Sequence, residues 1–257
     1  MMRVSEIPPW VIFHIPHDST TIPPELRDQF ILNDDDLSHE LGQMTDHFTY
    51  DLIAQNIPDI QIIRFPVSRL VVDVERFESD EEEPMAARGM GVIYEVTHQL
   101  KQMRRTLSLV EREHLLSTWY RTHHDLLTDS VNKTLENHGR ALIIDFHSFP
   151  SVALPYETDL TAYRPEICIG TDSFHTPNEV VVELTKYFEL HGFKVGVNTP
   201  FSGSIVPALH YKKDNRVQTL MIEIRRDLYL NESTSKLNEK FVRLKENLQN
   251  ILIACLS

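Results

Sequence analysis

The chain has 257 residues, of which 41% are hydrophobic and 25% are charged, and its formal net charge is −13. This length and composition fit a soluble globular protein built as one large α/β domain or two small ones. The acidic balance argues against nucleic acid and against an anionic membrane as partners, since both carry charge of the same sign.

Cysteine content and hydropathy narrow the class of protein further. Cys168 and Cys255 are too few to form a disulfide framework or a thiolate metal motif. The N-terminus lacks the apolar core of a signal peptide, and no segment is long and apolar enough for a transmembrane helix. We therefore expect a cytoplasmic protein.

The first half of the chain alternates short apolar runs with segments of helical spacing. Runs of apolar and β-branched residues predict strands at 10–15, 60–65 and 70–74. A short helix is expected from Pro24, and the acidic run that follows it is typical of a solvated cap or turn. Apolar residues at helical spacing predict one further helix over 37–53.

The second half continues this alternation. Helices are predicted over 108–137, 178–190 and 235–254. Strands are predicted at 141–144, 167–170, 193–197 and 217–224. Because strands alternate with helices and no repeat or low-complexity linker interrupts them, we predict a single α/β domain over 1–257, with a mostly parallel or mixed central sheet flanked by helices.

One strand runs directly into a polar cluster. The sequence ALIIDFHSFP places Asp145, His147 and Ser148 where an apolar run ends. Ligands of α/β sheets bind beyond the carboxyl ends of the strands. A neutral imidazole there can bind a metal ion, and a nearby carboxylate can fix its tautomer. The alternative is that His147 only makes local hydrogen bonds at the strand end.

Polar groups also follow three other predicted strands. His17 follows the first, Asp73 and Arg76 end the third, and Glu223 and Arg226 end the last. Two histidines and a carboxylate hold a zinc ion and leave one position for water, and a further carboxylate can act as the general base. Arginines at the same edge can bind a substrate carboxylate in a bidentate manner.

Structural interpretations compete with these functional ones. One alternative for Arg69 and Arg76 is a structural network of ion pairs with Asp73 and Glu75. His14 alternates with its apolar neighbours along a strand, which favours a packed histidine over a metal ligand.

A series of short motifs extends these observations over most of the chain. In order, they are PHDS (16–19), TDHFTYDL (45–52), SRLVVDVER (68–76), RGMGVIY (88–94), HHDLL (123–127), IIDFHS (143–148), NTPFSGS (198–204) and QTLMIEIRRDLY (218–229). Together they resemble the N-formylglutamate amidohydrolase family. The resemblance implies a zinc-carboxypeptidase-like (phosphorylase/hydrolase-like) α/β fold. It also implies metal-assisted hydrolysis of an N-acyl amide, in the type case releasing formate and glutamate during histidine degradation.

The resemblance also implies roles for the residues of the metal site. His17 and His147 match the metal histidines, and Asp46, in the TD motif, matches the third ligand. Asp18 and Asp145 are the alternatives for that ligand. One zinc ion is expected.

The remaining motif residues are expected to surround this ion. Glu223 matches the position of the general base in carboxypeptidase-like enzymes. Arg69, Arg76 and Arg226 are suited to the substrate carboxylate. We expect three further side chains to contact the metal ligands and hold their orientation without binding the ion: Asp73, Asp145 and Ser148. The sequence departs from the family pattern at Glu75, where the family often has asparagine.

We therefore predict a zinc-dependent hydrolase that cleaves the amide of a small N-acyl amino acid of the N-formylglutamate type. One alternative is a carboxypeptidase or deacylase acting on larger amides. Another is a catalytically silent protein that binds a small carboxylate, although the presence of both histidines together with Glu223 argues against it. The acyl group and the oligomeric state stay open.

Overall fold

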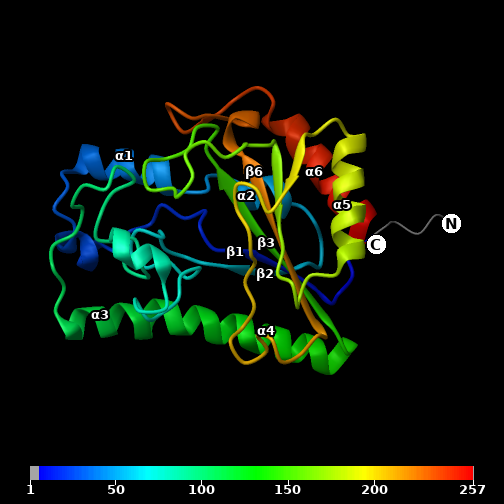
Figure 1. Ribbon diagram of the computed structural model, residues 1–257, viewed down its shortest axis with the longest axis horizontal. Helices are drawn as coiled ribbons and strands as arrows, with labels where there is room; N and C mark the ends of the chain where they lie inside the picture. Colours follow the sequence, from blue (N-terminus) through cyan, green and yellow to red (C-terminus); the bar gives the residue numbers. More distant parts are fainter. Residues whose placement is uncertain (1–5, 257) are drawn as a thin grey trace.

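A six-stranded sheet organises residues 6–256, the part of the chain that the computed structural model describes (Figure 1). The strand order is β2-β1-β3-β6-β4-β5, in which β2, β1, β3 and β6 run parallel while β4 is antiparallel to β6. The strands are β1 (Val11–Ile15), β2 (Gln61–Arg64), β3 (Ala141–Phe149), β4 (Ile167–Gly170), β5 (Val195–Val197) and β6 (Val217–Arg225). The prediction of an α/β fold with a mixed central sheet is confirmed.

One face of the sheet is covered by three helices and is largely apolar. These helices are α2 (Thr49–Ile53), α5 (Asn178–Leu190) and α6 (Phe241–Leu256). Because side chains alternate along a strand, every second residue of β3 lies on this face. Leu142, Ile144 and Phe146 accordingly pack in one buried cluster with residues of these helices.

The opposite face is apolar over only part of its length. Ala141 and Ile143 of β3 pack against Leu127 and Val131 of helix α4 (Thr122–His138). The next residues of β3 on this face are Asp145 and His147, because the alternation continues to the end of the strand. A buried polar region therefore begins where the apolar packing against α4 stops.

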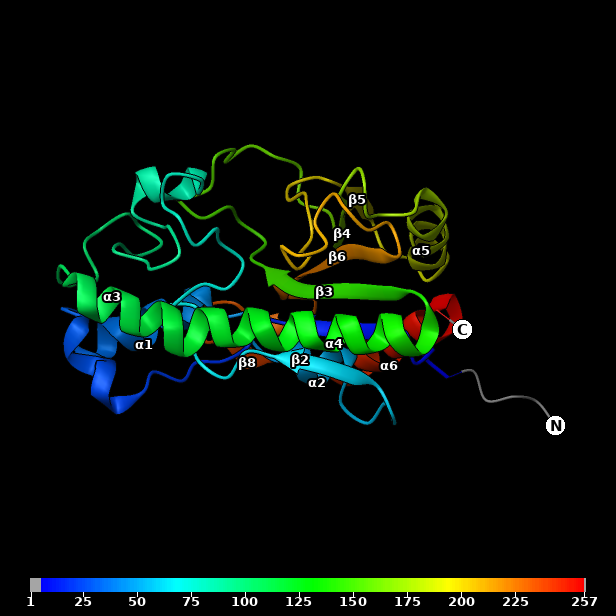
Figure 2. The same cartoon turned by 90° about the horizontal axis from the view of Figure 1, so that it is seen from below.

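A long helical segment runs along the sheet and beyond its end, in front of the strands in the view of Figure 2. It consists of α3 (Leu109–Leu115), a π-helical stretch (Leu116–Arg121) and α4. Ser108 and Glu111 form a capping box at its start, and Gly139 ends it in the left-handed conformation with a φ of 72°. The prediction of one long helix over 108–137 is confirmed.

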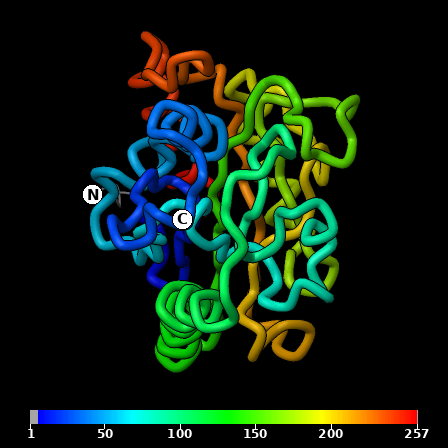
Figure 3. The backbone as a smooth tube through the Cα atoms, turned by 90° about the vertical axis from the view of Figure 1, so that its left-hand side faces the viewer, coloured from blue at the N-terminus to red at the C-terminus, as the bar shows by residue number. Residues whose placement is uncertain are grey.

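Two smaller apolar clusters lie beyond the carboxyl ends of the parallel strands. They are built from 22–44, 65–107, 115–120 and 154–156. Figure 3, viewed toward this end of the molecule, shows the blue segment that contains α1 (Asp34–Met44) and the cyan segment over 65–107 in front of the sheet. These segments form the walls of the region into which the strand ends point.

The strand predicted at 70–74 is wrong. Residues 66–83 form turns and loops, and the buried side chains of Val71, Val72 and Val74 pack against Leu115 and Tyr120 instead of lining a sheet. A short apolar run buried on all sides looks the same in sequence as a buried strand, so periodicity cannot separate the two.

The continuous helix predicted over 37–53 is also wrong. Helix α1 ends at Met44, α2 begins at Thr49, and Phe48 between them adopts the left-handed conformation with a φ of 62°. Asp46 lies in this connection, not on the polar side of a helix, and its N–H donates to the carbonyl of His17 at 2.9 Å. The break therefore brings Asp46 to the end of β1.

The other predicted elements differ mainly in their ends. The closing helix begins at Phe241, six residues later than predicted, because 236–237 form β8 (Lys236–Leu237), which pairs with β7 (Leu230–Asn231). The acidic run contributes Asn33 as the cap of α1, while its aspartates form the first helical turn. The helix predicted over 178–190 is confirmed as α5.

Within the described residues, no helix is long and apolar enough to cross a membrane.

Candidate active site

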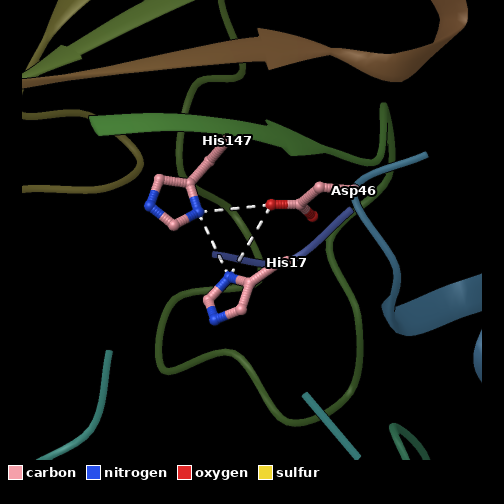
Figure 4. A group of neighbouring side chains, drawn as sticks. All are labelled: His17, Asp46 and His147. Atoms are coloured by element: carbon pink, nitrogen blue, oxygen red, sulfur yellow. Dashed lines mark hydrogen bonds and ion pairs between the residues drawn. The ribbon is translucent and has the colours of Figure 1, made fainter. Parts of the chain in front are cut away.

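Three buried side chains from separate parts of the chain meet at the end of the parallel strands (Figure 4). His17 follows β1, His147 lies in β3, and Asp46 lies between α1 and α2. The two Nδ1 atoms are 3.2 Å apart, and Asp46 Oδ2 lies 3.2 Å from His147 Nδ1 and 3.8 Å from His17 Nδ1. The structure thus brings together the three residues predicted as metal ligands.

The spacing of these atoms fits a zinc ion. Zinc–nitrogen bonds of about 2.0–2.1 Å place the ligands of a tetrahedral site roughly 3.3 Å from one another. Two facing imidazole nitrogens 3.2 Å apart also require a proton or a cation between them, since their lone pairs repel. Three protein ligands leave a fourth position for water or substrate, as in catalytic zinc sites.

Each histidine has a carboxylate next to its Nε2 atom, on the side of the ring away from the cluster. His17 Nε2 lies 2.7 Å from Asp73 Oδ1, and His147 Nε2 lies 3.1 Å from Asp145 Oδ1. At His17, an Nε2–H donated to Asp73 leaves the Nδ1 lone pair for the metal and fixes the orientation of the ring. His147 Nε2 lies close to Asp145 as an ion pair but has no hydrogen-bond partner among residues 6–256. The structure thus places Asp73 next to His17 and Asp145 next to His147, the two histidines that they are predicted to support.

The alternative third ligands point elsewhere. Asp18 accepts a hydrogen bond from Arg64 Nε at 2.9 Å and is not part of the cluster. Asp145 contacts the Nε2 side of His147, away from the Nδ1 that faces His17. The geometry therefore favours Asp46 as the third ligand.

Arg226 holds Asp46 in this orientation. Its Nη2 donates to Asp46 Oδ1 at 2.8 Å, which leaves Oδ2 directed toward the two histidines. The same guanidinium donates to Ser148 Oγ at 3.1 Å and to the carbonyl of Gln43 at 2.6 Å. All three guanidinium nitrogens thus have acceptors in the protein, and the contacts of Arg226 are those of a group that positions Asp46.

The protonation of the two histidines is set by their surroundings. Burial and the nearby Arg69 guanidinium lower the pKa of His17 to about 4, so this ring is neutral at neutral pH. Burial acts in the same direction on His147, but the carboxylates of Asp145 and Asp46 outweigh it and raise its pKa well above the usual value. A metal ion that binds between the rings would displace the proton from His147.

Glu223 supplies the carboxylate expected of a general base. It lies directly opposite His147 in the pairing of β3 with β6 and is 8% exposed. Its Oε2 is buried, and among residues 6–256 it has no hydrogen-bond partner. Burial, together with the charge of Asp46, raises the pKa of Glu223 to about 7. A carboxylate poised near neutrality can take up a proton and release it.

Two further arginines line the site next to Asp73. Arg69 donates to Asp73 Oδ2 from Nη2 at 2.7 Å and from Nε at 3.2 Å. Arg76 is less engaged, because its Nε lies 3.7 Å from Asp73 Oδ2 and its Nη1 lies 3.6 Å from Glu83 Oε1. Its Nε has no hydrogen-bond partner within the described part of the chain. Arg76 therefore has donor capacity for a further acceptor.

A sequence model of the N-formylglutamate amidohydrolase family matches residues 10–230. The chain belongs to this family. The match confirms the resemblance drawn from the motifs. No curated protein matches the chain in sequence.

Solved structures show the same relationship at the level of the fold. The structure is similar to N-formylglutamate amidohydrolase from Ralstonia eutropha JMP134, with a TM-score of 0.83 and 19% identity over 99% of this chain and 94% of that chain. It is also similar to a gene product of Agrobacterium tumefaciens, with a TM-score of 0.66 and 20% identity over 96% of this chain and 90% of that chain. At these identities the comparison establishes the fold.

Sequence reasoning missed two features of this family member's site. The hydroxyl of Tyr94 donates to Asp73 Oδ2 and helps to hold the carboxylate behind His17. Tyr94 lies in the RGMGVIY motif. This motif is part of the family resemblance, but it does not indicate what the Tyr94 side chain does. The sequence favours a packed histidine at position 14, yet Nδ1 of His14 lies 2.8 Å from Asp145 Oδ1. Its position on the same sheet face as Asp145 could have been inferred from the strand alternation.

We expect Arg76→Lys to weaken substrate binding in this amidohydrolase. Lysine keeps the charge but lacks the planar fork that binds a carboxylate in a bidentate manner, so KM should rise on the order of 10-fold with a smaller change in kcat. Steady-state kinetics on an active substrate measure both constants. Arg112→Lys, in a partly exposed ion pair with Asp80, is the matched control. Unchanged kinetics on every active substrate would assign Arg76 a structural role beside Asp73 and Glu83.

Proposed function

We propose that this chain is a metal-dependent amidohydrolase that cleaves the amide of a small N-acyl amino acid of the N-formylglutamate type. The observation that carries the proposal is the convergence of His17 Nδ1, His147 Nδ1 and Asp46 Oδ2 beside a carboxylate, Glu223, whose buried Oε2 has no partner in the described chain. Three ligands with a free base next to them are the minimum that metal-assisted hydrolysis requires.

His17, Asp46 and His147 would hold the metal, for which zinc suits the donor set of two imidazoles and one carboxylate. When bound, a zinc ion supplies Lewis-acid activation of water and of the amide carbonyl. Arg226 keeps Asp46 oriented throughout through its bond to Oδ1. The hydrogen bond from His17 Nε2 to Asp73 keeps the Nδ1 atom of His17 facing inward, and the Asp145 carboxylate lies 3.1 Å from Nε2 of His147.

Glu223 would move the proton that hydrolysis requires. Its carboxylate accepts a proton from water as the water oxygen attacks the carbonyl carbon of the substrate. The C–N bond then breaks, and Glu223 returns the proton to the leaving amine nitrogen, so that the products are a carboxylic acid and a free amino acid. With N-formylglutamate as the substrate, these products are formate and glutamate.

The arginines would select the substrate by its charge. Arg76, with an unused Nε, is the group best placed to bind a substrate carboxylate, and Arg69 keeps positive charge beside it while bound to Asp73. Neutral amides without a carboxylate should therefore be poor substrates.

A screen of N-acyl amino acids tests this function. Zinc-loaded protein is incubated with N-formyl and N-acetyl derivatives of glutamate, aspartate, glutamine and alanine, and the released amino acid is measured as free amine. We expect release from at least one acidic derivative, loss of release after chelation and recovery with added zinc. Binding of zinc without cleavage of any N-acyl amino acid or larger amide would contradict the proposal and favour a silent binding protein.

A further inference from the structure

A second group of metal-ligating side chains lies beside the candidate active site, on the sheet face that α4 covers. It consists of His14 on β1, Asp145 on β3 and Glu75, which follows Asp73 in the loop beyond the strands. His14 and Asp145 are paired in register, so their side chains project from neighbouring strands to the same face. His14 Nδ1 lies 2.8 Å from Asp145 Oδ1 and 3.3 Å from Glu75 Oε1.

Each of the two carboxylates of this group has one buried oxygen without a hydrogen bond. Glu75 Oε1 and Asp145 Oδ2 are both buried, and among residues 6–256 neither has a hydrogen-bond partner. The ion pairs that Glu75 and Asp145 make within those residues are to histidines, His14 and His147. Asp145 is paired with both histidines, whereas the only ion pair of Glu75 within the described residues is the 3.3 Å contact with His14. A carboxylate that is poorly compensated in the protein interior is costly, so Glu75 requires either a proton or a cation.

The environment of His14 allows its Nδ1 to act as a ligand. Its Nε2 lies 2.8 Å from Nε2 of His123 on α4, so one of these two nitrogens donates to the other. Burial and the neighbouring His14 lower the pKa of His123 to about 2, which keeps this ring neutral and able to accept. When His14 donates from Nε2, its Nδ1 presents a lone pair to the two carboxylates, as metal coordination requires.

We propose that His14, Glu75 and Asp145 form a second binding site for a divalent transition-metal ion, distinct from the site of His17, Asp46 and His147. One imidazole and two carboxylates suit Zn²⁺ or Mn²⁺. Asp145 Oδ1 contacts both His14 and His147, so this carboxylate would lie between the two ions and couple them. The side chain of Glu75 is 19% exposed, which gives an ion a route from solvent.

Metal content of single and double variants tests the second site. Protein stripped with a chelator is reloaded with excess ZnCl₂ or MnCl₂, desalted and analysed by mass spectrometry for metal per chain. We expect about two zinc ions in the native chain, about one in His17→Ala, about one in Glu75→Gln, and close to none in the double variant. Glutamine has the shape of a protonated glutamate, so this substitution removes only the negative ligand.

Controls separate loss of a ligand from loss of the fold. Glu82→Gln changes an exposed acid in the neighbouring loop and should keep both ions. Circular dichroism checks that each variant is folded, and Asp46→Ala replaces His17→Ala if the latter does not fold.

The outcomes distinguish this site from the proposed catalytic centre. One ion in the native chain that is lost with His17→Ala and retained with Glu75→Gln overturns the second site alone, and Glu75 then holds a proton. Two ions that both persist in Glu75→Gln overturn the assignment of its ligands. A native chain that binds no zinc overturns the second site and the proposed function together.

Discussion

Replacing His147 by alanine should remove the metal from the candidate active site. A centre with three protein ligands cannot spare one, because two ligands neither neutralise nor desolvate the ion sufficiently. Loss of a group that only supports a ligand already lowers metal affinity by about 10–100-fold, so loss of the ligand itself should lower it by on the order of 100-fold or more. Competition with a chromophoric zinc chelator measures the change.

The zinc affinity is best measured in the Glu75→Gln background. In that variant the second cluster lacks one of its ligands, so the zinc titration reports only the site of His17, Asp46 and His147. His114→Ala is the matched control, because this histidine is exposed on α3 and lies outside both clusters. Circular dichroism establishes that the variant is folded. A folded His147→Ala protein that binds zinc as tightly as its parent would show that His147 is not a ligand, and would return it to the role of a group that only makes hydrogen bonds at the end of β3.

The strand-end histidines were predictable because their positions follow from local sequence. His147 continues an apolar strand, and His17 follows one, so parallel pairing brings them to one edge of the sheet. The alternation along β3 also decides that His147 and Asp145 share a face. Sequence therefore predicted the residues that regular elements position.

Residues positioned by loops were predicted less well. Asp46 was chosen from a motif, while its helical spacing placed it wrongly within a helix, since nothing in that spacing reveals the left-handed turn at Phe48. Asp73 was assigned to a strand that does not exist, although its contact with His17 is present. In both cases the motif carried information that the apolar pattern lacked.

Contacts between distant segments were not predictable from local pattern at all. Arg226 reaches Asp46, which is 180 residues earlier in the chain, and His14 reaches His123 across 109 residues. The packing of α4 against the sheet creates the second contact, and its register against β1 is not encoded in any short stretch. Arg226 is predicted to bind substrate, but all three of its guanidinium nitrogens already donate to acceptors in the protein. To bind a substrate carboxylate, Arg226 has to share or give up one of these hydrogen bonds.

Replacing Glu223 by glutamine should abolish most turnover and leave the metal in place. Glutamine keeps the size of the side chain but cannot accept a proton from water, so kcat should fall on the order of 100-fold or more, the usual scale for positioned acid–base catalysis. A 100-fold loss corresponds to about 2.7 kcal/mol of lost transition-state stabilisation. KM should change little, since Glu223 is not assigned to substrate binding. Single-turnover kinetics and metal analysis on the same sample measure both properties.

The combination of lost turnover and retained metal is what distinguishes a base from a ligand. Glu232→Gln is a suitable control. Glu232 accepts a hydrogen bond from the backbone N–H of Ser151 at 2.7 Å and takes no part in either cluster. Loss of the metal from a folded Glu223→Gln protein would make Glu223 a ligand and release Asp46 from that role. Near-normal turnover would instead require another proton acceptor. Asp145 is then the next candidate, because it lies beside His147 and its Oδ2 is a buried carboxylate oxygen without a hydrogen bond in residues 6–256.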